Sequence, residues 1–524
     1  MRILKTLPIA AVLLGGCIDL DVSNPNEPDR DRVLNRPEDI ETLIAGTYRQ
    51  YFDQVQENYP NLPLAAMADN ATGGFFDFSL HDLSTEPRAA WNNSSLNTRD
   101  GVNEDPWYTM YAIISNVNDG LRALDGGAVI PGQNANARAY AFGRFVQGIA
   151  HGYLALHFDQ ALIIDVDTDL EQLDPTGFRP YTEVRDAALE MLDDAADIAG
   201  SSTFSIPGTV DWINGVPLTN AELVRVIRSY QARIIAYSGR TWEERNSADW
   251  NRVIQLVDAG IQSDLAPEGL LDVWESNMRR LWARVRTLPG DHARMDYFAV
   301  GPADVSGQFQ TWFATPSDNR MPFQLTSPDR RIQGAGGVNS NGTYVGYSAN
   351  TIWPAARGTY RFSWYYYLRS GQGESWYLGR QPTMTVAEMD LLGAEALIRT
   401  NRAADAVPLI NRTRVANGQL APVTVDGPPD DAQCVPRKTT GGCGSLWDAL
   451  RYEKTLELAG IEGAISWWDA RGWGTLQEGT LVHFPVPGRE IDNLGIANYT
   501  FGGGGEGSAP APQYHRCPVA LARC

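Results

Sequence analysis

Apolar side chains recur every three or four positions over most of the chain, which is the pattern of helices that bury one face. The first such stripe follows Pro37, a residue favoured in the first turn of a helix, and runs from Ile40 to Tyr51. Further stripes run over residues 107–117, 142–153, 181–192, 223–234, 250–257, 389–396 and 403–410. The sequence therefore predicts a mainly α protein.

Two of these helices begin at a Thr-x-x-Glu capping box, Thr219 to Glu222 and Thr385 to Glu388. In a capping box each side chain binds a backbone N–H that the first helical turn leaves free. A second helix follows each of them after a short polar turn. The chain is thus expected to hold helix–turn–helix pairs of the tetratricopeptide kind, which stack through small residues at their crossings.

The segment 267–384 separates the two pairs and is rich in Gly, Pro, Asn and aromatic residues. It is too aromatic for a disordered linker and too long for an ordinary loop. We expect irregular folded structure with few short strands, laid over the helical scaffold. Function is often carried by such irregular segments on a rigid support.

The first residues resemble an export signal for a lipoprotein. Arg2 and Lys5 precede a short apolar stretch, and Leu14-Gly15-Gly16-Cys17 matches a lipobox, in which the cysteine is acylated with fatty chains such as palmitate. The apolar stretch is far shorter than the ~20 residues of a membrane-spanning helix. We expect residues 1–16 to be a signal peptide and 17–35 a tether anchored through Cys17; the alternative is an ordinary secretory signal.

Charge and aromatic content narrow the class of ligand. The formal net charge is −20, which argues against nucleic acid, whose binders need a basic patch. The 15 Trp and 21 Tyr outnumber the 16 Phe, so most aromatic rings carry a polar edge. Such rings suit carbohydrate platforms and protein interfaces, although large helical proteins also use them as core residues.

Four cysteines remain beside Cys17, an even number in a chain expected to be exported. Sequence proximity suggests the pairs Cys434–Cys443 and Cys517–Cys524, each closing a short loop. The C-x-x-C spacing typical of zinc sites is missing. We therefore expect two disulfides.

Several motifs resemble the SusD/RagB family of surface lipoproteins, which take part in the uptake of polysaccharides and other nutrients. They are spread over nearly the whole mature chain in the family's order. The matching segments are Asp19-Leu20-Asp21-Val22-Ser23-Asn24-Pro25-Asn26, Trp107-x-x-x-Tyr111-x-x-Ile114-x-Asn116, Ala394-Glu395-Ala396, Ile410-Asn411-x-x-Arg414, Glu453-x-x-x-Glu457-Leu458, Glu462-Gly463, Trp468-Asp469 with Arg471, and Phe484-Pro485-Val486-Pro487 with Glu490. The stretch from Glu457 to Asp469 is longer than the family's, and an arginine expected after Glu462-Gly463 is absent.

The resemblance implies tetratricopeptide-like hairpins capped by less regular segments, with the motif residues in buried acid–arginine pairs and tight turns. It also implies a lid on a TonB-dependent, SusC-like transporter of the outer membrane, on the cell surface, that captures an oligosaccharide or a peptide. We accordingly expect an N-terminal SusD-like region over 36–266, the irregular insert over 267–384 and a C-terminal region over 385–524.

No catalytic motif is present in the sequence. It lacks a His-Glu-x-x-His helix, a phosphate loop and a Gly-x-Ser-x-Gly elbow. Asp165-x-Asp167-x-Asp169 resembles the start of a calcium loop, but Leu170 and Thr176 replace its glycine and glutamate, which favours a polar acidic turn. We predict no enzyme activity, no cofactor and no metal.

Two stretches combine aromatic rings with amides and arginines, the mixture that stacks on sugars and reaches their hydroxyl groups. Candidate ligand residues in the first are Phe75, Phe76, Arg88, Trp91, Asn92 and Asn93. The second includes Tyr297, Phe298, Phe309, Trp312 and Phe313, of which Tyr297 and Trp312 are the candidates. Trp91 and Asn92 lead, because an indole beside an amide in a Ser/Asn-rich loop is hard to place in a core.

Three functions are compatible with these sequence features. The first is a non-catalytic capture protein of the SusD kind. The second is a surface glycoside hydrolase, which would need a pair of carboxylates in a cleft. The third is a lipid-anchored helical-repeat adaptor that binds other envelope proteins and has no aromatic platform. The aromatic insert and the ordered motifs favour the first.

Overall fold

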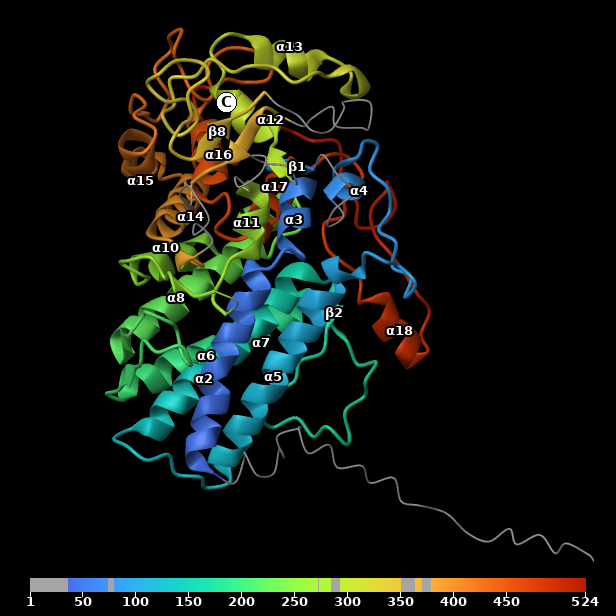
Figure 1. Ribbon diagram of the computed structural model, residues 1–524, viewed down its shortest axis with the longest axis vertical. Coiled ribbons are helices and arrows are strands. Elements are labelled where there is room, and N and C mark those ends of the chain that lie inside the picture. Colours follow the sequence, from blue (N-terminus) through green and yellow to red (C-terminus); the bar gives the residue numbers. More distant parts are fainter. Residues whose placement is uncertain (1–35, 74–79, 272, 284–292, 350–362, 370–377) are drawn as a thin grey trace, which may run out of the picture.

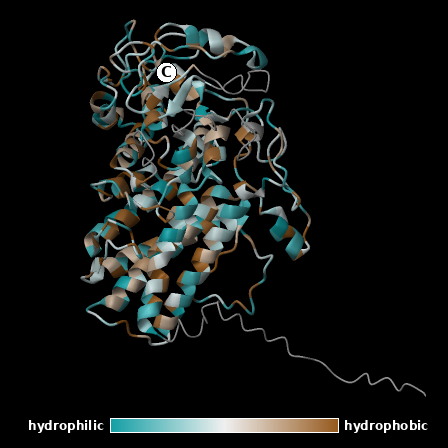
Figure 2. Cartoon of the chain, in the orientation of Figure 1, coloured by the Kyte–Doolittle hydropathy of each residue, from teal (hydrophilic) through white to brown (hydrophobic). Residues whose placement is uncertain are grey.

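The computed structural model describes residues 36–73, 80–271, 273–283, 293–349, 363–369 and 378–524, and its scaffold consists of helices (Figure 1). In the first half these are α2 (Pro37–Gln56), α3 (Asn61–Met67), α4 (Leu80–Ser84), η2 (Asp100–Val102), α5 (Glu104–Asp125), α6 (Ala135–His157), α7 (Tyr181–Ser201), α8 (Asn220–Tyr237), α9 (Trp242–Asn246) and α10 (Trp250–Asp258). The predicted amphipathic stretches all lie in helices, which confirms the mainly α class. In Figure 2 apolar and polar residues occur on the same helices, as expected when only one face is buried.

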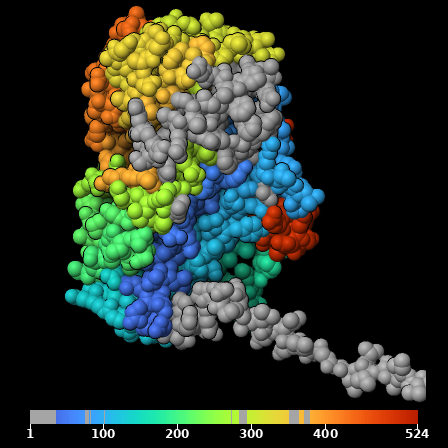
Figure 3. All heavy atoms as spheres, in the orientation of Figure 1, coloured from blue at the N-terminus to red at the C-terminus, as the bar shows by residue number. Residues whose placement is uncertain are grey.

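The insert is irregular, as predicted. It holds α11 (Asn277–Ala283), α12 (Tyr297–Val300), η3 (Gly301–Ala303), α13 (Gln308–Ala314) and η4 (Ser317–Asn319). The C-terminal region then returns to longer helices. These are α14 (Val386–Arg399), α15 (Ala403–Ala416), α16 (Leu446–Glu457), α17 (Gly463–Trp473) and α18 (Gly488–Leu494). Figure 3 shows the insert, in yellow, covering the upper end of the molecule on this face.

The strands of the described segments are short and form antiparallel pairs. The strands are β1 (Ala71–Gly73), β2 (Gln160–Ala161), β3 (Arg179–Pro180), β4 (Ser205–Ile206), β5 (Leu218–Thr219), β6 (Glu268–Gly269), β7 (Ala293–Met295), β8 (Val345–Tyr347), β9 (Tyr365–Tyr367) and β10 (Gly379–Arg380), and the pairs are β1–β7, β2–β3, β4–β5, β6–β10 and β8–β9. The pair β1–β7 sets Ala71 opposite Met295. It therefore joins the N-terminal region to the insert, beside the two stretches proposed to bind ligand.

The helical pairs that are far apart in sequence are neighbours in space. Helix α8 packs on α10, α10 on α14, and α14 on α15 and α16. The insert thus leaves the helical stack after α10, and the chain re-enters it at α14 (Figure 1). Helices α2, α5, α6 and α7 extend the stack at the other end. None of the helices that the structure describes is long and apolar enough to cross a membrane.

Two glycines allow α6 to lie close against its neighbours. A Cβ at Gly148 would stand 2.7 Å from the side chain of Leu192 on α7. At Gly152 it would stand 2.4 Å from Ile234 on α8. Both distances are below normal van der Waals contact, so any larger residue would push the helices apart. Small residues at crossings are the feature expected of stacked helical hairpins.

The two capping boxes fold differently. At α8 the box is complete, because Thr219 accepts from the Glu222 backbone and Glu222 accepts in return. At α14 only the Thr385 half forms. The Glu388 side chain instead pairs with buried Arg233, at 2.5 Å. A tertiary ion pair has thus replaced the Glu388 half of the local cap.

Three buried arginines, each surrounded by carboxylates, tie the regions together. Their partners are Glu388 and Glu462 for Arg233, Glu395 and Asp469 for Arg245, and Asp329, Glu453 and Glu457 for Arg331. Most of these acids belong to the motifs that resemble SusD proteins. Their predicted structural role, in buried acid–arginine pairs, is confirmed. Charges inside a protein demand such partners, because an unpaired buried charge is strongly destabilising.

One of these acids gives stability a pH dependence. Burial raises the pKa of Glu462 from its usual 4.5 to about 7, against the opposing influence of Arg233 and the Tyr153 hydroxyl, while Glu388 adds to the rise. The hydroxyl of Tyr51 also donates to this carboxyl group, at 3.4 Å. The folded state therefore holds a proton between pH 4.5 and 7 that the unfolded chain has released. This contribution to stability is full below pH 4.5 and is lost as the pH rises to 7.

We expect Glu462→Gln to remove this pH dependence. Between pH 5 and 7 the unfolding free energy of the wild type should fall relative to the variant by about 2–3 kcal/mol. Urea titrations at both pH values measure the difference. Buried His151 and His157, whose pKa values burial lowers to about 4 and 3, act in the opposite direction, but they are common to both proteins. Parallel pH profiles for the two proteins would contradict the expectation.

Candidate ligand pocket

Three of the residues proposed from the sequence, namely Cys17, Phe75 and Phe76, lie outside the described residues. Of the others, Asn92 is exposed, whereas Arg88, Trp91 and Asn93 are buried. The residue Trp91 is 7% exposed, and its ring packs edge-on against Phe484. The expectation that this indole cannot belong to a core is therefore wrong. In the described structure it does not present an open stacking face.

The burial of Trp91 has a tertiary cause. The C-terminal segment runs alongside its loop, and the Trp91 backbone N–H donates to the Phe501 carbonyl oxygen at 2.9 Å. Asn93 uses its amide to bind the carbonyl oxygens of Val486 and Tyr499, at 2.9 and 3.1 Å. These are structural contacts between segments about 400 residues apart, and the local sequence contains no sign of them.

Arg88 is also held by contacts within the protein. Its guanidinium donates to Asp69 at 3.0 Å and to the Thr480 hydroxyl at 3.0 Å. The interaction fixes the backbone around Asp69, which adopts a left-handed conformation with φ of 55°. Arg88 therefore positions Asp69, and Asp69 lines the pocket described next.

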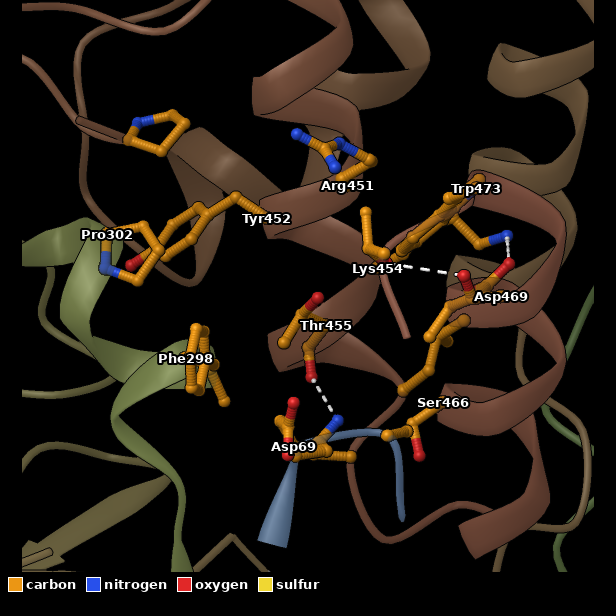
Figure 4. A pocket seen from close by; sticks show the side chains of 18 of the residues that line it. Asp69, Phe298, Pro302, Arg451, Tyr452, Lys454, Thr455, Ser466, Asp469 and Trp473 are labelled. Atoms are coloured by element: carbon orange, nitrogen blue, oxygen red, sulfur yellow. Dashed lines mark hydrogen bonds and ion pairs between the residues drawn. The ribbon is translucent and has the colours of Figure 1, made fainter. Parts of the chain in front are cut away.

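A cavity of about 150 Å³ opens where all three regions of the chain meet (Figure 4). This is far more than the ~10–15 Å³ that holds one water molecule. The N-terminal region contributes Asp69 and Asn70, and the insert contributes Phe298 and Pro302. Helices α16 and α17 form much of the opposite side, including Lys454, Thr455, Ser466, Asp469 and Trp473.

One wall of the pocket is aromatic. Phe298 is half-buried on α12 and stacks on Tyr514 of the C-terminal segment, with ring centroids 5.8 Å apart and planes 16° apart. Behind Phe298 lie Tyr297 and Trp312, both buried, and the Trp312 ring contacts Phe298 edge-on at 5.6 Å. Arg320 covers Trp312 at 4.6 Å. The predicted residues Tyr297 and Trp312 thus support the wall, and their neighbour Phe298 faces the cavity (Figure 4).

A polar edge lies beside the aromatic wall. The Asn70 side chain donates to the Thr455 carbonyl oxygen at 3.4 Å, while its own amide oxygen is buried with no hydrogen-bond partner among the described residues. The Gln477 amide bridges Asp69 at 3.0 Å and the Tyr514 hydroxyl at 2.7 Å. The edge therefore consists of an amide, a carboxylate and a phenol held in fixed positions.

Both predicted disulfides form, and both hold the rim of the pocket. Cys434–Cys443 closes a loop that contains Thr439, and Cys517–Cys524 closes the segment just after His515. The two loops meet where the Lys438 ammonium donates to the Arg523 carbonyl oxygen at 2.9 Å, and the Thr439 hydroxyl lies 2.8 Å from Nε2 of His515, just before the second loop. The C-terminal segment thus reaches the pocket through two stapled loops.

The acidic triplet around Asp167 forms a turn. Asp165 accepts from the Asp167 backbone at 3.1 Å and from the Thr168 hydroxyl at 2.7 Å, and Asp169 accepts from the Glu171 backbone at 3.0 Å. These carboxylates therefore form local turn contacts. No group of three or more acidic, His or Cys residues suited to a metal ion occurs within the described part of the chain.

Sequence reasoning missed most of the pocket residues. It singled out the aromatic stretch around Phe298, and it found the cysteines that staple the rim. The sequence did not link these residues to Asp69, Asn70 or Tyr514. Those segments meet only through the β1–β7 pair and through the C-terminal segment, and no spacing in the sequence predicts such contacts. The cysteine pair next to Tyr514 was the one sequence signal for this part of the pocket, since a disulfide fixes the position of the segment that it closes.

Several solved structures with a similar fold are SusD superfamily proteins. A SusD superfamily protein of Bacteroides vulgatus matches with a TM-score of 0.57 and 15% identity, covering 88% of this chain and 98% of its own. One from Parabacteroides distasonis gives 0.56 and 13%, covering 87% and 97%, and one from Bacteroides thetaiotaomicron gives 0.55 and 12%, covering 90% and 99%. No protein-family model and no curated protein matches the sequence. The chain has the fold of the SusD superfamily.

Proposed function

We propose that this chain is a non-catalytic glycan-capture lipoprotein that acts as the lid of a TonB-dependent, SusC-like transporter in the outer membrane. The observation that carries the proposal is the SusD-superfamily fold, which extends over almost the full length of both chains in each comparison. The lipobox at Cys17 and the ordered family motifs support it from the sequence.

The pocket chemistry suits a sugar. Phe298 and Tyr514 form a stacked aromatic wall on which the C–H face of a sugar ring can lie. The Asn70 amide oxygen beside it is a buried acceptor for a hydroxyl group. A buried acceptor without a partner costs about 1–3 kcal/mol, which a bound ligand hydroxyl would recover. We propose this pocket as the capture site, in place of a surface built around Trp91 and Asn92.

The pocket carboxylates favour binding over hydrolysis. Each of them has a cationic partner: Asp69 has Arg88, Asp448 has Arg451, Glu462 has Arg233, and Asp469 has Lys454 and Arg245. A glycosidase needs two carboxyl groups that can exchange protons with the substrate on either side of the scissile bond. Glu462 keeps its proton up to about pH 7, but Asp69, Asp448 and Asp469 are held in ion pairs with Arg or Lys, so the described pocket offers Glu462 no second carboxyl group for such a pair.

The anchor and the division into regions complete the proposal. Acylation at Cys17 would hold the protein on the membrane, since several acyl chains give stable attachment, and residues 17–35 would serve as the tether. The regions 36–266, 267–384 and 385–524 would then move together as the lid, because buried ion pairs such as Arg233–Glu462 and Arg331–Glu453 join them. We place the pocket on the cell-surface side.

The proposal predicts a transporter partner. Purification of the native lipoprotein from outer membranes in mild detergent should yield a TonB-dependent barrel in about equal amounts, identified by mass spectrometry. A Cys17→Ala variant, which has no acylation site, is the matched control and should be lost from the membrane fraction. Repeated recovery of other envelope proteins without a barrel would overturn the lid and favour a helical-repeat adaptor.

A further inference from the structure

Two cations on the pocket rim have no carboxylate partner within the part of the chain that the structure describes. Arg437 and Lys438 line the cavity from the loop that Cys434–Cys443 closes, and among the described residues neither forms an ion pair. The Lys438 ammonium donates to the Arg523 carbonyl oxygen at 2.9 Å, and one Arg437 terminal nitrogen donates to the Ala432 carbonyl oxygen at 2.8 Å. Both contacts are to neutral groups, so no described residue compensates the two positive charges.

The remaining charges around the cavity balance. The acids that line it are Asp69, Asp448, Glu462 and Asp469, and each has the Arg or Lys partner named above. The described part of the pocket therefore carries excess positive charge at Arg437 and Lys438. This is notable in a chain whose formal net charge is −20. A positive site in an acidic protein attracts anions locally while the rest of the surface repels them.

Hydrogen-bond donors without a partner also favour a negatively charged ligand. Among the residues that line the cavity, Trp282 Nε1, Arg437 Nε and Arg451 Nε are buried N–H groups without a hydrogen-bond partner in the described structure. Among the described lining residues, the Asn70 amide oxygen is the one buried acceptor without a partner, and His515 Nδ1 can act as donor or acceptor. Among the unpaired buried atoms of the described lining residues, donors thus outnumber acceptors. A ligand rich in acceptor oxygens, such as a carboxylate, satisfies such a set.

The rim loop is held in place. The Arg437 backbone N–H donates to the Pro302 carbonyl oxygen at 2.7 Å, next to α12, and Arg437 also pairs with Cys443 in a β-bridge. The Gln310 side chain donates to the Lys438 carbonyl oxygen at 3.0 Å. Since Phe298 lies on α12, these contacts fix the cations relative to the aromatic wall. A bound molecule would meet an apolar face and a positive edge in one pocket.

We infer that the pocket takes an acidic sugar, with the ring against Phe298 and Tyr514 and the carboxylate toward Arg437 and Lys438. The inference rests on the proposed capture function and names its ligand class: an oligosaccharide that contains uronic acid. A peptide with a free carboxylate shares the charge, but it lacks the flat C–H face and the several hydroxyl groups that suit the stacked rings and the Asn70 amide.

Isothermal titration of the full chain with paired trisaccharides tests this inference. The probes are trigalacturonate, its fully methyl-esterified form, triguluronate, trimannuronate, the neutral sugars maltotriose and cellotriose, and a tripeptide with a free carboxylate. We expect at least one acidic trisaccharide to bind and its uncharged counterparts to bind at least 10-fold more weakly. Arg437→Gln and Lys438→Gln should each weaken binding about 10-fold, the usual effect of losing a hydrogen bond to a charged group. Raising NaCl from 50 to 500 mM should weaken it several-fold.

Arg402→Gln is the matched control, because it removes one positive charge from an exposed pair with Asp405 on the α15 side of the molecule. It should leave binding unchanged. The salt series on the wild type keeps the test valid if either rim variant fails to fold.

Each other outcome overturns the inference. Neutral trisaccharides that bind as tightly as acidic ones would refute the ligand class but leave glycan capture intact. Binding of a free tripeptide instead would assign the pocket to peptides. Acidic binding that is unaffected by both rim variants would place the site elsewhere. If no sugar binds, glycan capture fails with the inference, while the transporter partnership is judged separately by the purification from outer membranes.

Discussion

Replacing Arg331 with methionine is expected to lower the free energy of unfolding by about 3–5 kcal/mol. The Arg331 side chain is 0% exposed, and its guanidinium lies 2.7 Å from Asp329, 2.6 Å from Glu453 and 2.8 Å from Glu457. Removing the cation leaves three fully buried carboxylates close together. Their mutual repulsion and lost hydrogen bonds are not replaced by the methionine side chain.

The effect should exceed that of an ordinary core substitution because the cluster joins distant segments. Asp329 and Arg331 belong to the insert, whereas Glu453 and Glu457 stand one turn apart on the same face of α16. Arg369 lies 3.3 Å from Glu457 and Arg414 lies 3.8 Å from Glu453, and these two cations do not balance three acids. Loss of Arg331 should therefore also loosen the insert on the scaffold.

Urea denaturation monitored by circular dichroism measures this change. Arg331→Lys is the graded control: it keeps the charge but loses the planar fork that binds several carboxylates at once, so it should be destabilised by a smaller amount. Arg402→Gln, at an exposed pair, should change stability by less than about 0.5 kcal/mol. An Arg331→Met protein within 1 kcal/mol of the wild type would show that the carboxylates accept protons at little cost.

Replacing Phe298 with alanine should abolish most ligand affinity. The ring is half-buried, stacks on Tyr514 at 5.8 Å and stands at the cavity wall (Figure 4). Loss of the apolar contact that a sugar would make with an aromatic ring corresponds to about 1.5–3 kcal/mol, that is ~10–100-fold in Kd. Titration with the best-binding trisaccharide measures the change.

Two further variants distinguish the loss of the ring's contact with the ligand from a loss of protein stability. Phe298→Leu keeps apolar volume against Trp312 but removes the flat face, so it should retain stability while still losing affinity. Tyr514→Phe keeps the stacked ring and loses only the hydroxyl that accepts from Gln477, so its affinity should stay within a few-fold of the wild type. Equal affinity for wild type and Phe298→Ala would exclude this pocket as the sugar site.

Local sequence determined the elements of this protein. Helix faces such as Ile40 to Tyr51, the Thr219 capping box and the small residues at crossings are set by interactions within a few positions, so periodicity alone predicts them. The pairings Cys434–Cys443 and Cys517–Cys524 were also predictable, because each closes a loop of fewer than ten residues. The mainly α class and the irregular insert followed from the same local signals.

Which residues form the ligand pocket depends on the tertiary structure alone. The residues that follow Trp91 in the sequence are polar and predict an exposed ring, but the C-terminal segment around Phe501 packs against it. Phe298 and Trp312 have similar local sequence surroundings, yet one faces the cavity and the other supports it from behind. Burial depends on which distant segments meet, and here those contacts span up to about 400 residues. Periodicity carries no information at that range, so the pocket and its uncompensated charges become visible only once the chain is folded.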